Sequence, residues 1–581
     1  MARRVHVALA ATAALAVGLA GCGSPSSSNK SSGGSNSGGA INTAVQGIDR
    51  NAKGPAPEVP GAHKGGTLTV YSQSTPNTLD PTNIYYTDSS EIGKLLYRTP
   101  TQYDIRSGKA VLVPDLTDLG TPSADGLTWT FKLQPNIKYA DGTPISVDDM
   151  AYAIKRSFAH DVFDAGPAYQ LSYFKDGDKY KGPYKDGDTY AGVETQGTDT
   201  LIIHLAKVFT DLPYFMTFPM FTPIPKAKDT KQDYQNNPMT TGPYMYDSFT
   251  PGSELKLKKN PNWDPNTDPA RHQYVDGFDF KWTQDDVKTQ QQVINSSGPD
   301  ASAINYYNID ASLVPQITAG KQSQLVQGDS PCTRVWQMDT RKIPLAVRKA
   351  IATAWPYDQV WKAEGYNPYT AERSSTILPP SIPGYSKYAA LPGLSGTGAG
   401  DPAAAKQMLT AAGKLGFEVS WYYDNTKPVP QQVSQVQSDG LTAAGFKVKA
   451  IGVATADLRT KTADYNAPVN MSQAPRGWCS DWPTGNSWLP VLFESHSISD
   501  GTSWGMMSDK ALDAEIDAVS ALPSDQATPK WAALDQKIMG LYIALPMDYE
   551  KQANVAGTNV GTTQIDPTMG MPYFQAMYLK S

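Results

Sequence analysis

Apolar and polar residues alternate in two segments of the chain, which is the pattern of a half-buried β-strand. In residues 66–71, Leu68 and Val70 alternate with threonines. Residues 127–133 follow an Asp-Gly turn and show the same period of two. The apolar face of this second segment consists of Leu127, Trp129, Phe131 and Leu133. The folded part is therefore predicted to open with a strand and to add another near residue 130.

Helical spacing follows the second strand. Ser146 stands three residues before Asp149, which is the arrangement of a capping box at the start of a helix. The residues after the cap keep a spacing close to that of one helical face, with apolar side chains at Val147, Met150, Ile154 and Phe158. Strand, turn and helix thus alternate in this part of the chain.

The same patterns continue toward the C-terminus. They predict strands at residues 201–205, 255–257, 417–423 and from 446, and helices at 344–354, 401–412 and 431–444. Two successive βα units after residue 400 indicate a separate α/β domain. Ser508 is predicted to cap a last amphipathic helix and Pro523 to end it. The apolar face of that helix carries Leu512, Ile516, Val519 and Leu522.

The first 22 residues have the features of an export signal. Arg3 and Arg4 supply positive charge, and residues 7–19 form an apolar stretch too short to span a bilayer. The stretch ends in Leu-Ala-Gly-Cys, which resembles the bacterial lipobox and predicts that Cys22 is acylated and becomes the mature N-terminus. The alternative is an ordinary cleaved signal in which this cysteine occurs by chance.

Residues 23–65 are predicted to form a tether. Residues 23–39 are almost wholly Gly, Ser, Asn and Pro, and residues 40–64 are poor in apolar pattern. Such a segment cannot bury enough surface to offset its ordering entropy, so we expect disorder until about Gly65. No later run approaches about 20 apolar residues, which leaves lipid as the expected attachment to a membrane.

Composition narrows the classes of function. The 581 residues, 40% of them apolar, suffice for two or three domains with large cores. The formal charge is −6, and the mixed order of the charges gives no basic stripe for a phosphate backbone, so nucleic acid is not an expected partner. Loss of Arg3 and Arg4 with the signal leaves 48 basic against 56 acidic residues. The mature protein is therefore expected to be mildly acidic.

The sequence does not carry the usual motifs of hydrolases or of nucleotide-binding enzymes. Its histidines are too scattered to suggest a metal site by spacing, and His204, within a predicted strand, is expected to be a packed residue. Acidic pairs such as Asp148-Asp149 and Asp285-Asp286 are expected to be helix caps and solvated groups. We therefore expect no enzymatic activity, no cofactor and no metal.

Cysteine usage is informative. If Cys22 carries lipid, Cys332 and Cys479 remain as an even pair in an oxidising compartment, which favours a disulfide that closes a loop of about 147 residues. The alternative is two free buried thiols.

Several segments from about Gly65 to the C-terminus resemble the family 5, or cluster C, extracellular solute-binding proteins of ABC importers. The strongest match runs from Asp125 to Ile145, and further matches lie in the order that the family shows. These further segments are 65–70, 79–81, 112–116, 241–244, 259–261, 347–351 and 477–481. The resemblance implies an α/β, two-lobed, periplasmic-binding-protein-like fold of type II, with an additional α/β domain, a cleft between the lobes and closure about a hinge.

The resemblance also implies a division of the chain. After the signal (residues 1–22) and the tether (23–65), lobe I is expected to begin at residues 66–97. The extra domain then occupies residues 98–221, and lobe I resumes at 222–332. Lobe II is expected at residues 333–555, before a return to lobe I at 556–581.

Site residues come from the same resemblance. In the family's oligopeptide binders, the Asp of the Gly-Trp-Cys-x-Asp motif pairs with the peptide's α-ammonium, and its Cys forms a disulfide with an earlier Cys. Here these residues are Asp481, Cys479 and Cys332. Tyr169 is the nearest equivalent of a tyrosine that helps to hold the amine, and Arg476 is displaced from the family's basic position for the ligand carboxylate. Backbone contacts with an extended ligand are implied at Tyr85, Tyr86 and Thr87, and side-chain pockets at Trp478 and Trp482.

We therefore expect a lipid-anchored binding protein on the extracytoplasmic face of the cell membrane. It would capture peptides with a free amino terminus and deliver them to the permease and ATPase subunits of an ABC importer, and we expect it to be a monomer. Two alternatives remain within the same fold: a sugar, heme, siderophore or metal chelate as the ligand, or a role as a peptide-pheromone receptor. A lipid-anchored hydrolase would need a nucleophile with a base, and neither is evident in the sequence.

Overall fold

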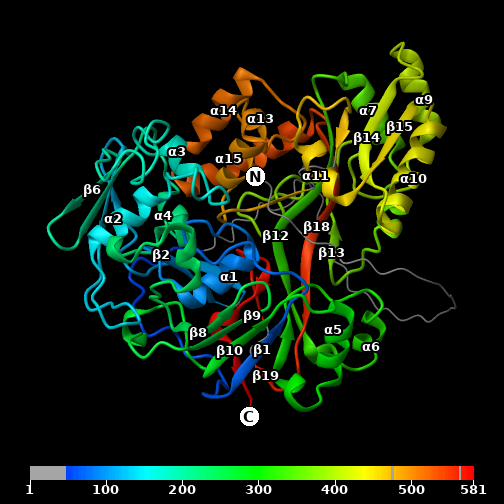
Figure 1. Cartoon of the computed structure of the whole chain (residues 1–581). Helices are drawn as coiled ribbons and strands as arrows, with labels where there is room; N and C mark the ends of the chain where they lie inside the picture. Colours follow the sequence, from blue (N-terminus) through cyan, green and yellow to red (C-terminus); the bar gives the residue numbers. More distant parts are fainter. Residues whose placement is uncertain (1–46, 107, 473–476, 562–563, 581) are drawn as a thin grey trace, which may run out of the picture.

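The computed structural model describes residues 47–106, 108–472, 477–561 and 564–580. The chain folds into two lobes and an extra domain, each with its own apolar core (Figure 1). The expected α/β, two-lobed architecture is confirmed. In Figure 1, lobe I lies at the bottom, the extra domain at the left and lobe II at the upper right.

Lobe I is built on a five-stranded sheet with the order β11-β1-β10-β9-β8. Strand β1 lies parallel to β10 and β11, whereas β9 and β8 run antiparallel. The sheet strands are β1 (Thr67–Tyr71), β8 (Tyr244–Thr250), β9 (Glu254–Lys259), β10 (Gly277–Lys281) and β11 (Ala303–Asn305). The helices are α1 (Thr87–Leu96), α5 (Asp286–Asn295) and α6 (Val314–Thr318). The C-terminal segment returns to this lobe with the short strands β19 (Val560–Gly561), β20 (Ile565–Asp566), β21 (Met571–Pro572) and β22 (Tyr578–Leu579).

The extra domain contains an antiparallel sheet with the order β4-β5-β7-β6 and a separate hairpin, β2-β3. Its strands are β2 (Thr101–Arg106), β3 (Lys109–Pro114), β4 (Thr121–Pro122), β5 (Thr128–Lys132), β6 (Val193–Gln196) and β7 (Thr200–His204). Its helices are α2 (Val147–Arg156), α3 (Tyr169–Tyr173) and α4 (Leu212–Phe215). The predicted strand at residues 127–133 is β5, in which Trp129 and Phe131 are buried, but Leu127 precedes the strand and is 36% exposed.

Lobe II combines an antiparallel sheet with a parallel βα unit. The sheet strands are β12 (Leu325–Met338), β13 (Ala371–Arg373), β16 (Met471–Ser472), β17 (Gly477–Cys479) and β18 (Ala544–Val555). The parallel pair is β14 (Glu418–Asp424) and β15 (Lys447–Val453), joined by α10 (Pro428–Ala443). The remaining helices are α7 (Leu345–Ala354), α8 (Tyr357–Ala363), α9 (Pro402–Ala411), α11 (Thr455–Ala463), α12 (Leu489–Phe493), α13 (Ser497–Asp500), α14 (Lys510–Ser520) and α15 (Ser524–Met539). The two predicted βα units after residue 400 are confirmed.

Strands β12 and β18 connect the two lobes. They pair from Leu325 opposite Val555, in a core shared with lobe I helices, to Gln337 opposite Ala544, in lobe II. Figure 1 shows the two strands running side by side from the lower half of the molecule into the upper half. Their register shifts between Asp329 and Thr333. Because a bulge bends and twists a strand pair, this interruption is the natural place for the lobes to pivot.

Buried ion pairs join the extra domain to lobe I. Arg271 of lobe I contacts Asp115 of the extra domain over 2.9 Å and Asp268 over 3.1 Å, and all three side chains are at most 1% exposed. Burial alone would raise the pKa of Asp268, but the Arg271 and Arg98 charges lower it to about 2. Breaking a buried pair leaves an uncompensated charge, so these two parts are expected to move as one body against lobe II.

The capping box at Ser146 is confirmed. Its hydroxyl accepts from the Asp149 N–H over 3.1 Å, and the Asp149 carboxylate accepts from the Ser146 N–H. We predict that Ser146→Ala lowers the free energy of unfolding by about 1 kcal/mol, because an N-terminal amide of α2 loses its acceptor. Urea titration would measure the change, with Ser172→Ala, an exposed serine of α3, as the control. Equal midpoints for the two variants would contradict the capping role.

Two local predictions are wrong. Helix α14 is capped by Asp509, whose carboxylate accepts from the N–H groups of Ala511 and Leu512, and not by Ser508. An aspartate one residue later is an equally good cap, and the helix is in register with it. The helix also ends at Ser520, and Pro523 instead precedes α15, where its missing N–H is harmless.

The predicted tether is ordered over its last part. Residues 47–65 lie along the fold: Leu112 exchanges backbone hydrogen bonds with Gly47 and Asp49, and the Ala56 N–H donates to Asp268 O over 3.0 Å. The Val59 N–H donates to the Tyr274 hydroxyl over 3.0 Å. The expectation of disorder up to Gly65 is therefore wrong for residues 47–65, because edge hydrogen bonds compensate for a weak apolar pattern. Cys22 and the rest of the tether lie outside the described residues.

Candidate functional site

Asp481 lies where the three parts of the molecule meet. It follows β17 in lobe II, and its side chain is buried, with 2% exposed. The Tyr85 hydroxyl of lobe I donates to Asp481 Oδ2 over 2.9 Å, and the Tyr169 hydroxyl of the extra domain donates to the same oxygen. Residues separated by about 400 and 300 positions in the sequence thus converge on one carboxylate.

The Tyr169 phenol is a neutral donor. Burial, together with the Asp481 charge, raises the pKa of the Tyr169 phenol well above its usual value. Tyr169 therefore keeps its proton and donates a hydrogen bond to the carboxylate. The Tyr85 and Tyr169 hydroxyls thus orient this carboxylate at the junction of the three parts.

Strand β17 presents a backbone edge beside Asp481. It pairs antiparallel with β12, and the Ser480 N–H donates to Pro331 O over 2.8 Å. In this register the backbone groups of Trp478 face β12, whereas those of Gly477 and Cys479 face away. Among the described residues, β12 is the one strand that pairs with β17. Gly477 has no room for a side chain, because a Cβ there would lie 2.5 Å from Thr333 O.

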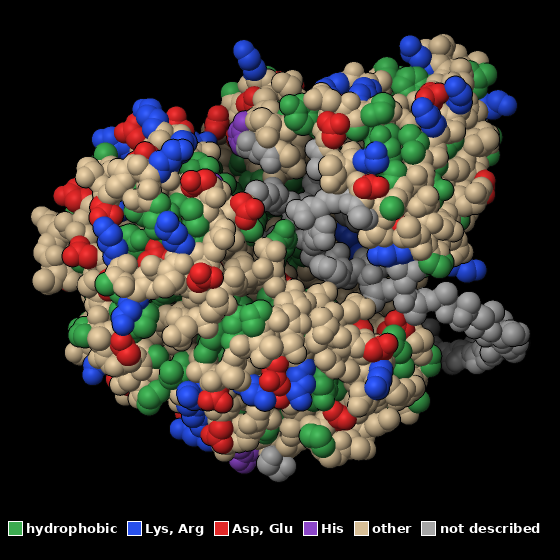
Figure 2. All heavy atoms as spheres, in the orientation of Figure 1, with side chains coloured by type: hydrophobic (Ala, Val, Ile, Leu, Met, Phe, Trp, Pro, Cys, Tyr) green, Lys and Arg blue, Asp and Glu red, His purple; other side chains and the backbone are tan. Residues whose placement is uncertain are grey.

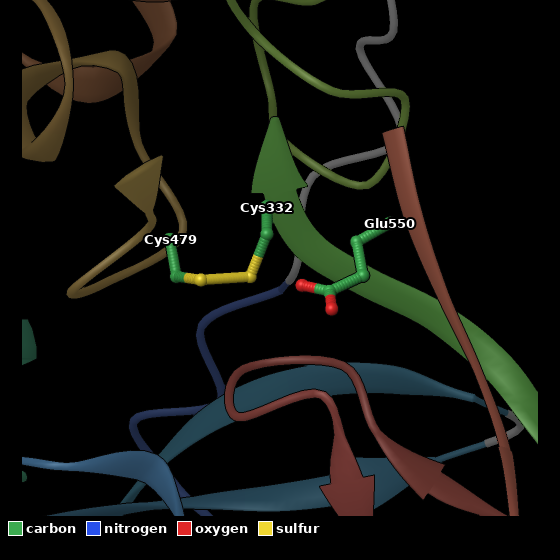
Figure 3. A group of neighbouring side chains, drawn as sticks. All are labelled: Cys332, Cys479 and Glu550. Atoms are coloured by element: carbon green, nitrogen blue, oxygen red, sulfur yellow. A yellow bond between two sulfur atoms is a disulfide. The ribbon is translucent and has the colours of Figure 1, made fainter. Parts of the chain in front are cut away.

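A disulfide ties the Asp481 segment to the connecting strand. Cys332 of β12 and Cys479 of β17 are bonded, with their Cα atoms 4.0 Å apart, which confirms the predicted pairing (Figure 3). The bond joins the end of β17 to β12 close to the register shift, two residues before Asp481. The disulfide therefore holds the Asp481 segment against the strand that connects the lobes.

Figure 3 also shows Glu550 of β18, whose carboxylate lies near the disulfide. Cys332, Cys479 and Glu550 are residue types that bind metals, and their ligand atoms lie within 4.8 Å of one another. Because both sulfur atoms are used in the disulfide, one carboxylate remains, which is too few ligands for a metal centre.

Burial raises the pKa of Glu550 to about 7, although the Arg334 guanidinium lowers it; Asp548 raises it further. The folded protein therefore binds this proton more tightly than the unfolded chain. As a result, the free energy of unfolding falls by about 3 kcal/mol as the pH rises from about 4.5 to about 7. We predict that Glu550→Gln removes this loss and stabilises the protein at pH 8 relative to pH 5. Urea titrations at both pH values would measure it.

The control for this measurement is Glu372→Gln. Glu372 lies on the neighbouring strand β13, but it is exposed and pairs with Lys551 at the surface. An unchanged pH dependence in the Glu550→Gln variant would show that Glu550 titrates normally.

The two predicted pocket tryptophans differ in their surroundings. Trp478 is 2% exposed, lies in the lobe II core and donates its indole N–H to Ser487 O over 2.8 Å. Trp482 is 1% exposed and packs in the core of the extra domain, with its ring centroid 4.9 Å from that of Tyr169. Trp482 therefore lies next to Asp481 and Tyr169. Trp478 instead packs in the core of lobe II, within the segment that carries Asp481.

The loop before α1 contributes a side chain, Tyr85, to the candidate site around Asp481. Tyr86 precedes the helix and its carbonyl accepts from the Ser90 N–H, while Thr87 is the first residue of α1. Tyr85 reaches Asp481 with its hydroxyl, a role that the sequence did not suggest. Sequence reasoning also missed Asp211, whose Oδ2 accepts from Trp482 Nε1 over 2.8 Å. An aspartate before a Leu-Pro helix start looks like an ordinary cap. Arg476 lies outside the described residues.

A family model described as bacterial extracellular solute-binding proteins, family 5, middle part, matches residues 111–500. The chain belongs to this family. Its members are binding proteins for transport and are not enzymes, and the predicted family membership is confirmed. A relative of this family 5 protein is the probable D,D-dipeptide-binding periplasmic protein of Escherichia coli (strain K12). It is 23% identical over 448 residues, which cover 74% of this chain and 77% of the relative.

Solved structures show the same fold. The clavulanic acid biosynthesis oligopeptide binding protein 2 is 25% identical, with a TM-score of 0.81 over 91% of this chain and 99% of that one. A periplasmic murein tripeptide binding protein, described as an unliganded open form, is 16% identical, with a TM-score of 0.68 over 91% of this chain and 99% of that one. The family 5 fold is thus shared over 91% of the chain.

Two further features concern the helices and one face of this family 5 protein. In the part of the chain that the structure describes, no helix is both long and apolar enough to cross a membrane. Figure 2 shows basic and acidic side chains interspersed over one face. Among the described residues of this face, the two signs are mixed and do not form a single-sign patch of the kind that steers a highly charged polymer.

Proposed function

We propose that this chain captures peptides with a free amino terminus and delivers them to an ABC importer. The observation that carries the proposal is Asp481, a buried carboxylate between the lobes that accepts from Tyr85 of lobe I and Tyr169 of the extra domain. The names of three similar proteins support the ligand class, since they refer to a D,D-dipeptide, an oligopeptide and a murein tripeptide.

The chemistry of the site favours an ammonium group. An α-ammonium carries a positive charge and three N–H donors, and a carboxylate such as Asp481 is an acceptor for both. The outward backbone groups of Gly477 and Cys479 supply donors and acceptors for an extended main chain, as in strand addition. Together they would hold the first residues of a peptide irrespective of its side chains.

Closure would complete the site. Tyr85 and Tyr169 belong to the body formed by lobe I and the extra domain, whereas Asp481 and β17 belong to lobe II. Moving lobe II about β12 and β18 would therefore separate the carboxylate from both phenols. Ligand that bridges the two bodies would shift the equilibrium toward the closed form.

The remaining sequence predictions belong to this proposal. Cys22 would carry the lipid anchor, and the chain would act as a monomer at the extracytoplasmic face beside the permease and ATPase subunits. The residue boundaries given for lobe I, the extra domain and lobe II also stay part of this proposal.

Native mass spectrometry of the protein purified from its own host tests the ligand class. A ladder of bound masses that fit peptides is the expected result, and one non-peptide mass would overturn it. Calorimetric titration with trialanine and N-acetyl-trialanine tests the amine. Trialanine should bind with a Kd in the micromolar range or better, and the acetylated peptide, which lacks the charge, at least about 100-fold more weakly.

A further inference from the structure

Asp211 of the extra domain directs its side chain to lobe II. It precedes helix α4, and its backbone carbonyl accepts from the N–H groups of Tyr214 and Phe215. Its carboxylate does not cap that helix; Oδ2 accepts from Trp482 Nε1 over 2.8 Å and from Thr484 Oγ1 over 2.5 Å. The residue is 4% exposed, so these bonds are formed away from water.

The donors come from a segment that is anchored in lobe II and inserted into the extra domain. Trp488, six residues after Trp482, lies fully buried in the lobe II core. Trp482 itself packs among aromatic rings of the extra domain, including Phe209 at 5.8 Å and Phe215 at 6.2 Å between centroids. The contact between Asp211 and Trp482 therefore spans the two bodies that separate on opening.

The contact between Asp211 and Trp482 is adjacent to Asp481, the carboxylate that is proposed to bind the ligand. Asp481 is the residue immediately before Trp482, and Tyr169 touches both: its hydroxyl donates to Asp481 and its ring packs edge-on against Trp482. Asp211 thus determines where the backbone after Asp481 lies against the extra domain. A shift of Trp482 would carry Asp481 away from Tyr169.

We propose that Asp211 is a positioning residue for ligand capture: it accepts from Trp482 and Thr484 when the lobes close, and so holds Asp481 against Tyr169 and keeps the ligand enclosed. The inference rests on the proposed function for its ligand. Asp211 would thus slow the dissociation of the protein–ligand complex without contacting the ligand itself.

The stabilisation that Asp211 provides should be confined to the closed form. When lobe II swings away, the Asp211 carboxylate and the two donors are hydrated separately, and the interaction is lost. In the closed form, Asp211→Ala leaves the Trp482 N–H and the Thr484 O–H buried without this acceptor, which is unfavourable. Asp211→Asn retains an acceptor oxygen of the same reach.

Calorimetry and stopped-flow dissociation with trialanine test the inference on the purified protein. Asp211→Ala should raise Kd at least about tenfold, mainly through faster dissociation, and Asp211→Asn should remain within about threefold of the wild type. Small-angle X-ray scattering should show a larger radius of gyration for Asp211→Ala than for the wild type in the presence of trialanine. Trp482→Phe, which keeps the ring but lacks the N–H, should weaken binding less in the Asp211→Ala background than alone.

Asp178→Ala is the matched control, since Asp178 is an exposed aspartate of the same domain. The inference is overturned if Asp211→Ala and the wild type have the same dissociation rate and the same radius of gyration, with and without trialanine. Additive effects of the Asp211→Ala and Trp482→Phe substitutions would overturn it as well. Failure of the proposed function looks different: the wild type itself would then show no response to trialanine.

Discussion

Asp481→Asn is expected to weaken trialanine binding by roughly 100-fold or more. The amide keeps the shape of the side chain and still accepts from Tyr85 and Tyr169, but it lacks the charge that, in the proposed function, neutralises the ligand ammonium. Leaving one partner of a buried ion pair without the other costs about 3 kcal/mol or more, and 1.4 kcal/mol corresponds to a factor of ten in Kd. Isothermal titration calorimetry would measure the loss.

The acetylated peptide makes this test specific. In the wild type, trialanine should bind much more tightly than N-acetyl-trialanine, and Asp481→Asn should abolish most of that difference. Tyr85→Phe and Tyr169→Phe each remove one hydrogen bond to the carboxylate and should produce smaller losses, whereas Tyr173→Phe, on the same helix α3 as Tyr169, should bind normally. A persistent preference for the free amine in Asp481→Asn would place the ammonium elsewhere.

Removing the disulfide is expected to have the largest effect on stability. Cys332 and Cys479 are 147 positions apart, and in the chain-entropy model closing a loop of that length stabilises the fold by about 5 kcal/mol. The double variant Cys332→Ala with Cys479→Ala should therefore unfold at a clearly lower urea concentration. Its peptide affinity should also fall, because the segment that carries Asp481 is no longer tied to β12.

Tryptophan fluorescence is well suited to this measurement. The lobe II core contains several buried tryptophans, among them Trp336, Trp355, Trp421, Trp488 and Trp504. The wild type treated with a reductant in urea serves as the matched control, since it should approach the midpoint of the double variant. If the oxidised wild type and the double variant share one midpoint, the disulfide does not stabilise lobe II.

Local sequence patterns predicted most elements because short-range physics dominates them. The capping box at Ser146 depends on residues three positions apart, and the period of two in β5 depends on neighbours along one strand. Where several residues could serve the same local role, the pattern was less decisive. Asp509 and Ser508 are both competent caps, and the choice between them depends on how α14 packs.

In the candidate site, too, some residues could be predicted from the sequence and others could not. The Gly-Trp-Cys-x-Asp segment singled out Asp481, Cys479 and Cys332, because the resemblance to family 5 attached roles to those positions. The partners of Asp481 are less visible in the sequence, since Tyr85 and Asp211 are joined to residues 481–484 by contacts that span 271 to 396 positions. No spacing rule connects residues so far apart.

The sequence by itself thus determined the family, the α/β class and most helix and strand positions, and it singled out Asp481 as the candidate carboxylate. The tertiary structure alone decided which side chains surround that carboxylate, how residues 47–65 lie along the fold and that Asp211 bridges to lobe II. The physical reason is that periodicity and capping act between neighbours in the chain, whereas the burial of Asp481 arises only when lobe I, the extra domain and lobe II come together.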